Sequence, residues 1–286
     1  MLNEYCSIPV FVDIEQYSFN IDPEEVLKAI TPKTRAVIAV HFGGAFCRIE
    51  ELTTICRDHR LHLIEDAAHA HGSSWNGKRA GGFGVFGSFS FQNGKVLCAG
   101  EGGMLVSSDG ELAELARSIA NQGRVLGRSF YDHHRIGTNF RLTAFQAAVL
   151  LAQFERLPSQ IAMRTRHAAL LKEQVSDLEE IIWQKIPAAV TENSNYLLLG
   201  RLQGGRVSRD EFQRRLTEAG VPCTPFYPHT LYNNPVYRQQ GSCRVLPCPV
   251  SEACVNDAFW LPHRVLLAEE ETILSIARVI REALKG

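Results

Sequence analysis

IEDAAHAHG (residues 64–72) and GSFSFQNGK (residues 87–95) are the two segments that decide the fold of this chain. The first begins at the end of a short apolar run, LHLIE, which is typical of a buried strand, and the second alternates polar and apolar residues as a strand does. Asp66 comes directly after the first strand, and Lys95 follows the second across a short polar turn. Because open α/β sheets present their ligands at the carboxyl ends of strands, we expect a carboxylate and an amine to meet there.

Outward from these segments, short apolar runs alternate with helical patterns, which predicts an α/β domain with a mostly parallel sheet. The pattern from Thr143 predicts a helix that ends near Pro158 and a second helix after it. We predict a large domain over residues 1–157, whose sheet lacks its N-terminal part, and a smaller C-terminal α+β domain over residues 158–286. Strands are expected at residues 9–13, 36–41, 61–65, 88–92, 104–107 and 196–202, and the other helices at residues 50–59, 111–121, 209–219 and 269–284.

The composition is that of an ordinary globular protein. Of its 286 residues, 45% are hydrophobic and 21% charged, which is enough apolar material for two domains. Thirty basic and thirty-one acidic residues give a net charge of -1 without any block of like charges, so neither nucleic acid nor a membrane surface is expected as a partner. The sequence starts without a basic and apolar leader, and no apolar run is long enough to span a bilayer, so we expect a cytoplasmic protein.

The cysteines favour reduced thiols over a disulfide framework, since all eight lie scattered along a long chain. Cys243, Cys248 and Cys254 raise a zinc hypothesis, but they include no Cys-x-x-Cys pair and have no histidine at ligand spacing. We therefore expect no metal site. The cysteine positions are 6, 47, 56, 98, 223, 243, 248 and 254.

Asp66 and Lys95 each have a plain alternative role. The aspartate would cap the Ala-rich turn that follows it, and a lone lysine in a loop is usually a solvated surface charge. Together, however, they are the residue types that pyridoxal phosphate (PLP) needs. An amine bonds to its aldehyde, and a carboxylate keeps its pyridine nitrogen protonated so that the ring accepts electrons. Ser90, on the strand before the lysine, is a candidate donor to the cofactor phosphate or an ordinary strand-face serine.

The segments IEDAAHAHG, GSFSFQNGK and AGEGGMLV, in this order and spacing, resemble the DegT/DnrJ/EryC1/StrS family of PLP-dependent aminotransferases. The resemblance continues through GTNFRLTAFQAAVLLAQFERL to FWLPHRVLLAEEE and so covers essentially the whole chain. SFSFQNGK and WLPHRVLL look closest to 3-amino-5-hydroxybenzoate synthases and inosose aminotransferases, and GVPCTPFYPHTLYNNPVY leans toward the inosose enzymes. The resemblance implies the fold-type I architecture of PLP-dependent transferases, which is like that of aspartate aminotransferase.

The resemblance also implies roles for single residues. Lys95 matches the lysine that carries PLP, Asp66 the partner of the pyridine nitrogen, and Ser90 the serine that binds the phosphate. His69 stands where the family has Gln or His beside the cofactor ring, with a structural histidine as its plain alternative. Gln92 occupies a variable position of the family and is expected either to touch the cofactor or to pack.

Asn139 matches an asparagine that, in the family, reaches the cofactor phosphate from the neighbouring subunit. Its plain alternative is a turn residue before the next helix. The resemblance therefore implies a homodimer whose subunits share each site. It also excludes the 3-deoxygenating branch of the family, whose members carry a histidine where this chain has Lys95.

Two other patterns carry no functional prediction. Gly82, Gly84 and Gly87 spell a GxGxxG, yet a strand is expected after them, so no helix N-terminus is available for a pyrophosphate and we interpret the motif as a flexible turn. His41 and His71 lie beside glycines near strand ends, and we interpret both as structural.

By resemblance, family members have a further N-terminal segment before the strand that matches PVFVD (residues 9–13). That segment supplies a Gly-Ser/Thr helix N-terminus for the phosphate and an aromatic residue that stacks on the ring. We find no counterpart here, and we expect the chain to be a fragment, a mis-started reading frame or a shortened form.

Three hypotheses on function follow. The first is transfer of an amino group from glutamine or glutamate to a keto-sugar or keto-cyclitol in secondary-metabolite or cell-surface sugar biosynthesis. Tyr227 and His229 are its candidate substrate contacts, unless their loop is only a Pro-stiffened connection. The second keeps PLP but performs the dehydration and aromatisation of 3-amino-5-hydroxybenzoate synthases. The third is a non-catalytic homologue that dimerises or binds a partner.

Overall fold

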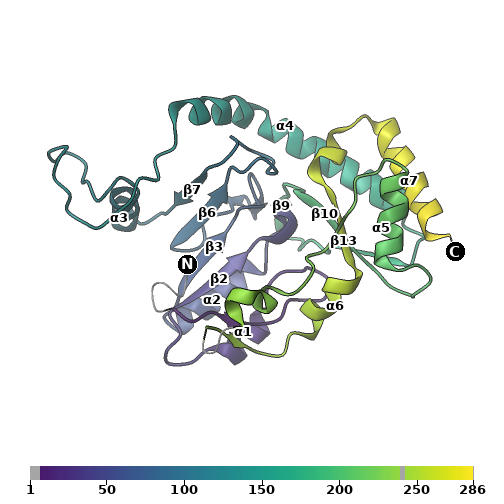
Figure 1. The fold of residues 1–286 in the computed structure, drawn as a ribbon, viewed down its shortest axis with the longest axis horizontal. Coiled ribbons are helices and arrows are strands. Elements are labelled where there is room, and N and C mark those ends of the chain that lie inside the picture. The colour runs from purple at the N-terminus through teal and green to yellow at the C-terminus, as the bar shows by residue number, and fades with distance from the viewer. Residues whose placement is uncertain (1–6, 239–241, 286) are drawn as a thin grey trace.

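The computed structural model describes residues 7–238 and 242–285, and a four-stranded sheet lies at the centre of its N-terminal half (Figure 1). The strand order is β2-β3-β6-β7, and of these four only β7 runs antiparallel to its neighbour. This confirms the expected mostly parallel sheet. The strands are β2 (Ala36–Val40), β3 (His62–Asp66), β6 (Phe86–Ser90) and β7 (Gly103–Val106).

Helices α1 (Pro23–Ala29) and α2 (Ile49–Asp58) cover one face of this sheet. Strand side chains alternate between the faces, so Val37 and Ala39 of β2 are buried with these helices while Ile38 is exposed on the other face. The register pairs the last residue of β3 with β2 on one side and with β6 on the other. The carboxyl ends of the three parallel strands therefore lie side by side.

The C-terminal half contains a second, antiparallel sheet in the order β11-β13-β10-β8. Helices α5 and α7 and the end of α4 pack on it around one apolar core. This arrangement agrees with the expected α+β character of the C-terminal part. The elements are β8 (Ile181–Trp183), β10 (Leu197–Leu202), α5 (Arg209–Glu218), β11 (Thr224–Pro225), α6 (Pro249–Asp257), β13 (Ala258–Pro262), η5 (His263–Leu267) and α7 (Glu270–Leu284).

Shorter elements connect these layers. A three-stranded sheet in the order β5-β4-β9 lies beside the central one, and 3-10 helices occupy several of the turns. They are η2 (Phe42–Gly44), β4 (Ser74–Trp75), β5 (Lys78–Arg79), β9 (Val190–Glu192), η3 (Leu231–Asn233) and η4 (Pro235–Tyr237).

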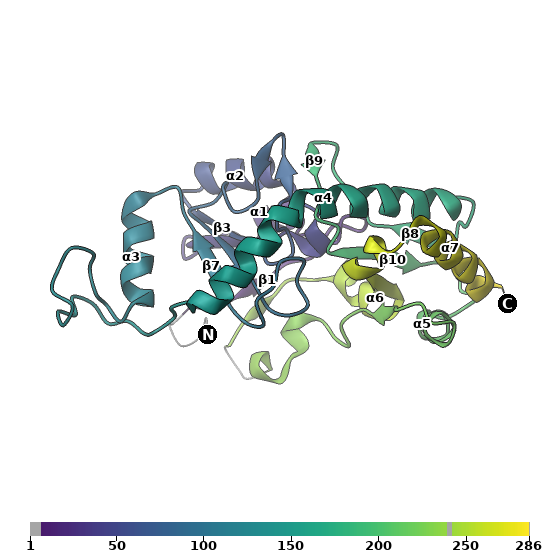
Figure 2. The same ribbon diagram turned by 90° about the horizontal axis from the view of Figure 1, so that it is seen from above.

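The two helices predicted on either side of Pro158 are one helix, α4 (Ala144–Gln174), which runs from one half of the molecule to the other (Figure 2). The prediction of a break was wrong. Pro158 does remove one helical N–H, but the burial of Leu157 and Ile161 on either side of it offsets that loss. Since α4 passes through residues 157 and 158, the predicted domain boundary stays a prediction. No helix in the described ranges is long and apolar enough to cross a membrane.

The strand expected at residues 9–13 is present in shortened form, and it lies outside the central sheet. This strand, β1 (Val10–Phe11), pairs in parallel with β12 (Arg244–Val245). Directly after β1, Asp13 accepts hydrogen bonds from the N–H groups of Val250 and Ser251 at 2.8 and 2.9 Å. A buried carboxylate at the start of α6 thus holds this segment against the C-terminal half, a long-range contact that strand periodicity does not reveal.

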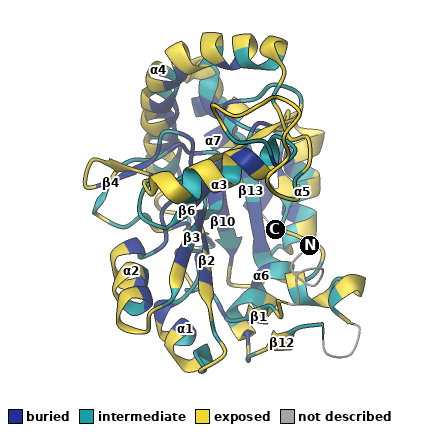
Figure 3. Ribbon diagram, turned by 90° about the vertical axis from the view of Figure 1, so that its left-hand side faces the viewer, coloured by how far each residue is buried: buried dark blue, intermediate teal, exposed yellow. Residues whose placement is uncertain are grey.

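A long arm of residues 121–143 links α3 (Gly110–Ala120) to α4 and extends beyond α3 in Figure 1. Its apolar side chains face solvent, with Ile136 99% exposed and Phe140 74% exposed. Figure 3 shows that the exposure continues along the first part of α4, where Phe145 is 87% exposed. This surface is the largest departure in the structure from the rule that apolar side chains are buried.

Candidate active site

Lys95 and Asp66 lie at the carboxyl ends of adjacent strands, as predicted. Asp66 is the last residue of β3, and Lys95 lies in the turn after β6, with its N–H bonded to the carbonyl of Gln92 at 2.9 Å. The lysine side chain is half-buried and lies over the ring of Tyr196, with Nζ 4.8 Å from the ring centre. Among the described residues its ammonium forms no hydrogen bond or ion pair.

The pKa of Lys95 is lower than that of an ordinary lysine. Burial lowers this pKa, because desolvation disfavours the charged amine, and the carboxylate of Asp66 opposes the shift. A larger fraction of Lys95 is therefore the neutral, nucleophilic amine at a given pH. The opposing contribution also shows that Asp66 is the charged neighbour of this amine.

His69 lies in the same cluster and is neutral. Burial, followed by the nearby charge of Lys95, lowers its pKa to about 3. Its Nδ1 accepts a hydrogen bond from the N–H of Gly43 at 3.3 Å, so the single proton of the imidazole is on Nε2. The ring centre is 4.4 Å from that of Tyr196. His69 is therefore placed to donate a hydrogen bond from Nε2, and it does not carry positive charge.

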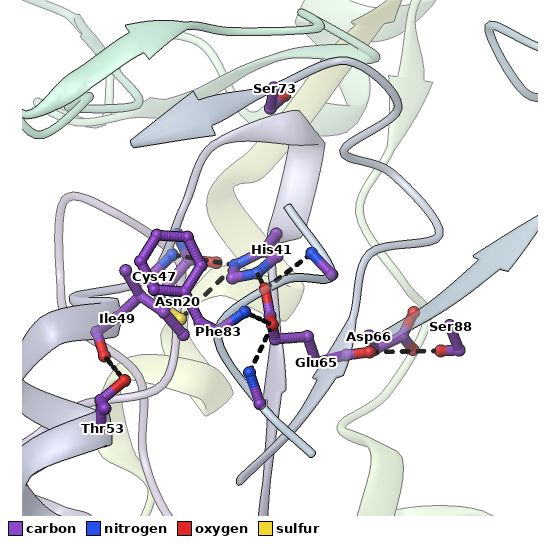
Figure 4. A network of polar contacts seen from close by, with 12 residues as sticks. Asn20, His41, Cys47, Ile49, Thr53, Glu65, Asp66, Ser73, Phe83 and Ser88 are labelled. Atoms are coloured by element: carbon purple, nitrogen blue, oxygen red, sulfur yellow. Dashed lines mark hydrogen bonds and ion pairs between the residues drawn. The ribbon is translucent and has the colours of Figure 1, made fainter. Parts of the chain in front are cut away.

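A buried carboxylate next to Asp66 joins the turn before β6 to the ends of β2 and β3 (Figure 4). Glu65, at 0% exposure, accepts hydrogen bonds from Gly81 N, Phe83 N and Gly84 N at 2.8, 2.6 and 2.7 Å, and from Nε2 of His41 at 3.0 Å. Burial alone would raise the pKa of Glu65, but these donors outweigh it and the pKa lies below its usual value. Glu65 is thus an anion that anchors the turn before β6 to the ends of β2 and β3.

The network includes a motif to which the sequence assigned no function. The glycine-rich turn before β6, which was interpreted as flexible, is held by three hydrogen bonds to Glu65. A Cβ at Gly84 would lie 2.4 Å from the carbonyl oxygen of Leu63, so this position requires glycine for close approach of the backbone. A strand does follow the motif, as expected.

Cys47 completes a cysteine, histidine and carboxylate series, but it is not a nucleophile. Its Sγ lies 3.5 Å from Nδ1 of His41, whose other nitrogen bonds to Glu65. The thiol is fully buried, and burial raises its pKa far above the usual range, so the reactive thiolate is disfavoured. The seven cysteines in the described part of the chain are free, and Cys6 lies outside it.

Ser90 and Gln92 brace the turn that carries Lys95. The hydroxyl oxygen of Ser90 accepts a hydrogen bond from the N–H of Gln92 at 3.3 Å, and Oε1 of Gln92 accepts one from the N–H of Gly94 at 2.7 Å. Ser90 is half-buried and Gln92 is exposed. Both side chains therefore border the lysine turn, and their role toward a cofactor stays a prediction.

Of the two predicted substrate contacts, the structure brings only Tyr227 to the cluster. Burial raises the pKa of Tyr227, and the charge of Asp66 raises it further, so its hydroxyl lies within electrostatic reach of that carboxylate. Its ring packs against Phe42 and Trp260, at centre distances of 6.2 and 5.6 Å. His229 instead bonds to Asn234 at 3.0 Å, within its own loop.

Asn139 is not brought to Lys95 within one chain. It is an exposed residue of the arm, where it forms a bridge with Asn121 and accepts a hydrogen bond from the N–H of Arg141 at 3.2 Å. A role at the cofactor would therefore require a second copy of the chain.

The sequence analysis missed Tyr196 and His263, which complete the cluster. The two rings stack at a centre distance of 5.7 Å, and Nε2 of His263 donates a hydrogen bond to the carbonyl of Gly94 at 3.2 Å, next to Lys95. His263 lies within the WLPHRVLL segment that carried the family resemblance, and this is the signal that could have identified it. Tyr196 directly precedes a buried strand and has no comparable local signal.

These residues fit PLP. An amine without a hydrogen-bonding partner in the described chain lies beside a carboxylate, the two groups that the aldehyde and the pyridine nitrogen require. A neutral histidine and a tyrosine ring, tilted by 43° to each other, lie next to them. Within residues 7–238 and 242–285, no ion pair holds Lys95 away from a ligand.

Comparison with known proteins agrees with this chemistry. The model of the DegT/DnrJ/EryC1/StrS aminotransferase family matches residues 1–281. The chain is 35% identical to the 3-amino-5-hydroxybenzoate synthase of Amycolatopsis mediterranei (strain S699), over 97% of this chain and 74% of that protein. It is 33% identical to the L-glutamine:scyllo-inosose aminotransferase of Streptomyces griseus, over 97% of this chain and 72% of that enzyme.

The fold is shared as well. The crystal structure of 3-amino-5-hydroxybenzoic acid synthase superposes with a TM-score of 0.87 at 35% identity, covering 95% of this chain and 73% of that one. The expected aminotransferase architecture is thereby confirmed. The chain belongs to the DegT/DnrJ/EryC1/StrS aminotransferase family, whose members depend on pyridoxal phosphate.

Proposed function

We propose that this chain transfers an amino group from glutamine or glutamate to the ketone carbon of a sugar or cyclitol, as a cytoplasmic enzyme. The observation that carries the proposal is the environment of Lys95, a half-buried amine of lowered pKa beside Asp66 and over Tyr196. The L-glutamine:scyllo-inosose aminotransferase named above supports glutamine as donor and a cyclitol as acceptor.

In this proposal Nζ of Lys95 would hold the cofactor through its aldehyde, and the carboxylate of Asp66 would keep the pyridine nitrogen protonated. When bound, PLP supplies an electron sink that stabilises negative charge at the α-carbon of the donor. Once released, Nζ of Lys95 would take the proton from that α-carbon as a general base and deliver it as a general acid to the carbon of the cofactor that derives from its aldehyde. With the acceptor bound, the same amine would move a proton the opposite way, from that cofactor carbon to the former ketone carbon. Its lowered pKa suits this role, because the neutral amine must be present to accept the proton.

His69, Ser90 and Gln92 complete the proposed cofactor site. Nε2 of His69 carries a proton and is free to donate it in a hydrogen bond to a ring substituent of the cofactor. We assign the phosphate to the hydroxyl of Ser90, with the side chain of Gln92 at the rim. Their existing bonds within the lysine turn fix the hydroxyl and the amide next to Lys95.

We propose that two copies form a homodimer through the arm and the first part of α4. Ile136, Phe140 and Phe145 are too exposed and too apolar to remain in water. Dimerisation through this surface would bring Asn139, which lies among them, toward the partner's cofactor phosphate. The proposed homodimer thus explains why an asparagine far from its own Lys95 matches a site residue of the family.

Tyr227 is the proposed substrate contact from the C-terminal half, with His229 further along the same loop. Phe42, Tyr227 and Trp260 form an aromatic wall near Asp66, which suits the apolar face of a six-membered ring. This wall favours a compact cyclic ketone as the acceptor.

The test is cofactor capture at Lys95. Purified protein mixed with PLP should absorb visible light, and borohydride reduction should attach the cofactor to the peptide that contains Lys95. Lys95→Ala should remove both signals, while the same change at the exposed Lys33 should leave them intact. Absence of the signals in the wild-type protein would support a non-catalytic homologue and contradict the proposal.

Dehydration and aromatisation of the kind performed by 3-amino-5-hydroxybenzoate synthase is the second candidate, because the 35% identity to that enzyme supports it. The two candidate reactions can be distinguished by the substrate that the protein accepts. A keto-cyclitol with glutamine should yield an aminocyclitol under the first proposal, whereas an aminodehydroshikimate should yield an aromatic product under the second.

A further inference from the structure

Arg164, on α4, is a fully buried cation at 0% exposure. Its Nε donates a hydrogen bond to the carbonyl of Ser194 at 2.7 Å, while Nη1 and Nη2 are buried and meet no acceptor in residues 7–238 and 242–285. No carboxylate in these ranges pairs with it. Burial lowers its pKa to about 10, so the guanidinium is still charged at neutral pH. A buried charge with so few partners destabilises a fold, and its presence calls for a reason other than stability.

Ser194 connects this cation to the residues around Lys95. Its hydroxyl donates to the carbonyl of His69 at 2.7 Å, and its N–H donates to the hydroxyl oxygen of Ser73 at 2.9 Å. The Ser73 hydroxyl donates in turn to the carbonyl of Gly44 at 2.7 Å. Every polar group of Ser194 is thus used, and the carbonyl that Arg164 binds belongs to the residue that holds His69.

The same hydrogen bonds hold η2 close to His69. A Cβ at Gly44 would lie 2.1 Å from the hydroxyl oxygen of Ser194, and the φ of Gly44 is +101°, so both contact and backbone require glycine there. Its neighbour Gly43 donates the hydrogen bond that occupies Nδ1 of His69. A shift of Ser194 would therefore move His69 and its hydrogen-bond donor relative to each other.

Arg164 also lies close enough to His263 for its charge to act on that imidazole. Burial, followed by the charge of Arg164, lowers the pKa of His263 to about 4, so this histidine is neutral and donates from Nε2 to Gly94. His263 stacks on Tyr196, the ring beneath Lys95. Arg164 is thus linked to both histidines near Lys95, to His69 through Ser194 and to His263 through its charge.

We propose that Arg164 is a positioning residue that acts through Ser194 to hold His69 beside Lys95 with its proton on Nε2. The inference rests on the proposed function for the roles of His69 and Lys95. Positioning explains why a destabilising cation stays in the core, because functional sites are where local rules of stability are broken.

The first measurement is the tautomer of His69 in the protein without cofactor, by nitrogen-15 NMR of the imidazole, with His69→Asn assigning the signal among the ten histidines. Wild-type protein should show Nδ1 as acceptor and Nε2 as protonated. Arg164→Met should give a mixture of tautomers, and Arg164→Lys should restore part of the wild-type signal, since an ammonium can still donate to Ser194. Arg166→Met, an exposed arginine on the same helix, should leave His69 unchanged.

The second measurement is binding of PLP to Lys95, followed by visible absorbance as a function of pH. We expect Arg164→Met to weaken apparent binding by about tenfold and to shift its pH profile, since small misplacements of reacting groups have large effects. If Arg164→Met does not fold, Ser194→Ala removes only the bonds of its hydroxyl and should change the same two signals less strongly.

Wild-type tautomer and wild-type binding profile in Arg164→Met, or in Ser194→Ala where Arg164→Met does not fold, would overturn the proposal. Failure of the proposed function is a separate result, because it would appear as no PLP bound to Lys95 in the wild-type protein. The tautomer measurement would still decide the role of Arg164 in that case.

Discussion

The interior around Glu65 and the arm of residues 121–143 are opposites in how their side chains meet their surroundings. Glu65 is fully buried, yet its carboxylate accepts four hydrogen bonds within the chain. The arm, by contrast, exposes the apolar side chains of Ile136 (99%) and Phe140 (74%) to solvent. The scaffold of the active site is therefore complete inside one chain, whereas the arm is not.

This difference separates what one chain needs for folding from what it needs for function. Buried polar groups without partners cost free energy, so the network around Glu65 must form whenever the central sheet forms. Exposed apolar side chains cost less free energy, so a single chain can fold before a partner chain covers them. We expect the carboxyl ends of the strands to be ordered in a single chain and the arm to be ordered by a second copy.

The largest effect is expected when the interior network is broken. Glu65→Gln replaces an anion that faces four donors by an amide that must turn its own N–H groups toward some of them. We expect the free energy of unfolding to fall by about 3–5 kcal/mol. Urea unfolding followed by circular dichroism measures this loss.

The matched control is Glu51→Gln, which removes an exposed carboxylate that pairs with Arg48. It should cost less than about 1 kcal/mol, because exposed ion pairs contribute little. Equal losses for the two variants would contradict the central role of the Glu65 network.

The second effect concerns the arm and should change assembly without changing folding. Phe145→Asp places a charge in the proposed interface, so the dimer should dissociate while the unfolding midpoint of the monomer stays the same. Analytical ultracentrifugation across a range of concentrations detects the change. Leu27→Asp, at an exposed apolar residue of α1 outside this surface, serves as the control. A wild-type protein that is monomeric at every concentration would refute the proposed interface.

The third effect is the dependence of stability on pH. His69 and His263 have folded pKa values of about 3 and about 4, both below the ordinary value of 6.5. Between these values and 6.5 the unfolded chain binds more protons than the folded chain, so stability is full above pH 6.5 and decreases as the pH falls toward 4. Urea midpoints at pH 7 and pH 5 should show the decrease, and His263→Gln should make it smaller. A midpoint that does not change over this range would contradict the buried, neutral state of both histidines.

The smallest effect is a difference in thiol reactivity. Cys47 is buried and its pKa is raised, whereas Cys98 and Cys243 are only half-buried. Iodoacetamide should therefore modify Cys98 and Cys243 in folded protein well before Cys47, and urea should abolish the difference. Mass spectrometry of the peptides measures the order, and early labelling of Cys47 would show that the interior network opens readily.

Much of the fold follows from local patterns. The alternation of SFSFQ and the apolar run LHLIE lie within one or two residues of the observed β6 and β3. The break predicted near Pro158 was wrong, and the pairing of the strand within residues 9–13 could not be predicted, since both depend on distant packing. Leu157 and Ile161 hold α4 together, and Arg244 and Val245 provide the partner of β1.

The candidate site divides in the same way. Lys95 and Asp66 were predicted from the order of strands, turns and chemistry in a stretch of thirty residues. Tyr196 and His263 were not, because they come from the second sheet; His263 bonds to Gly94 across 169 positions of sequence. Nothing in the sequence distinguishes Glu65 from other strand residues, and only the structure shows that three backbone N–H groups donate to its carboxylate.

The sequence by itself determined the family, the type of sheet and the pairing of an amine with a carboxylate at adjacent strand ends, because each depends on residues that are neighbours along the chain. Only the tertiary structure decided that Glu65 joins the turn before β6 to the ends of β2 and β3, that Tyr196 lies beneath Lys95 and that Arg164 is buried behind His69. These relations join residues that are distant in sequence, and the packing of the two sheets and α4 brings them into contact.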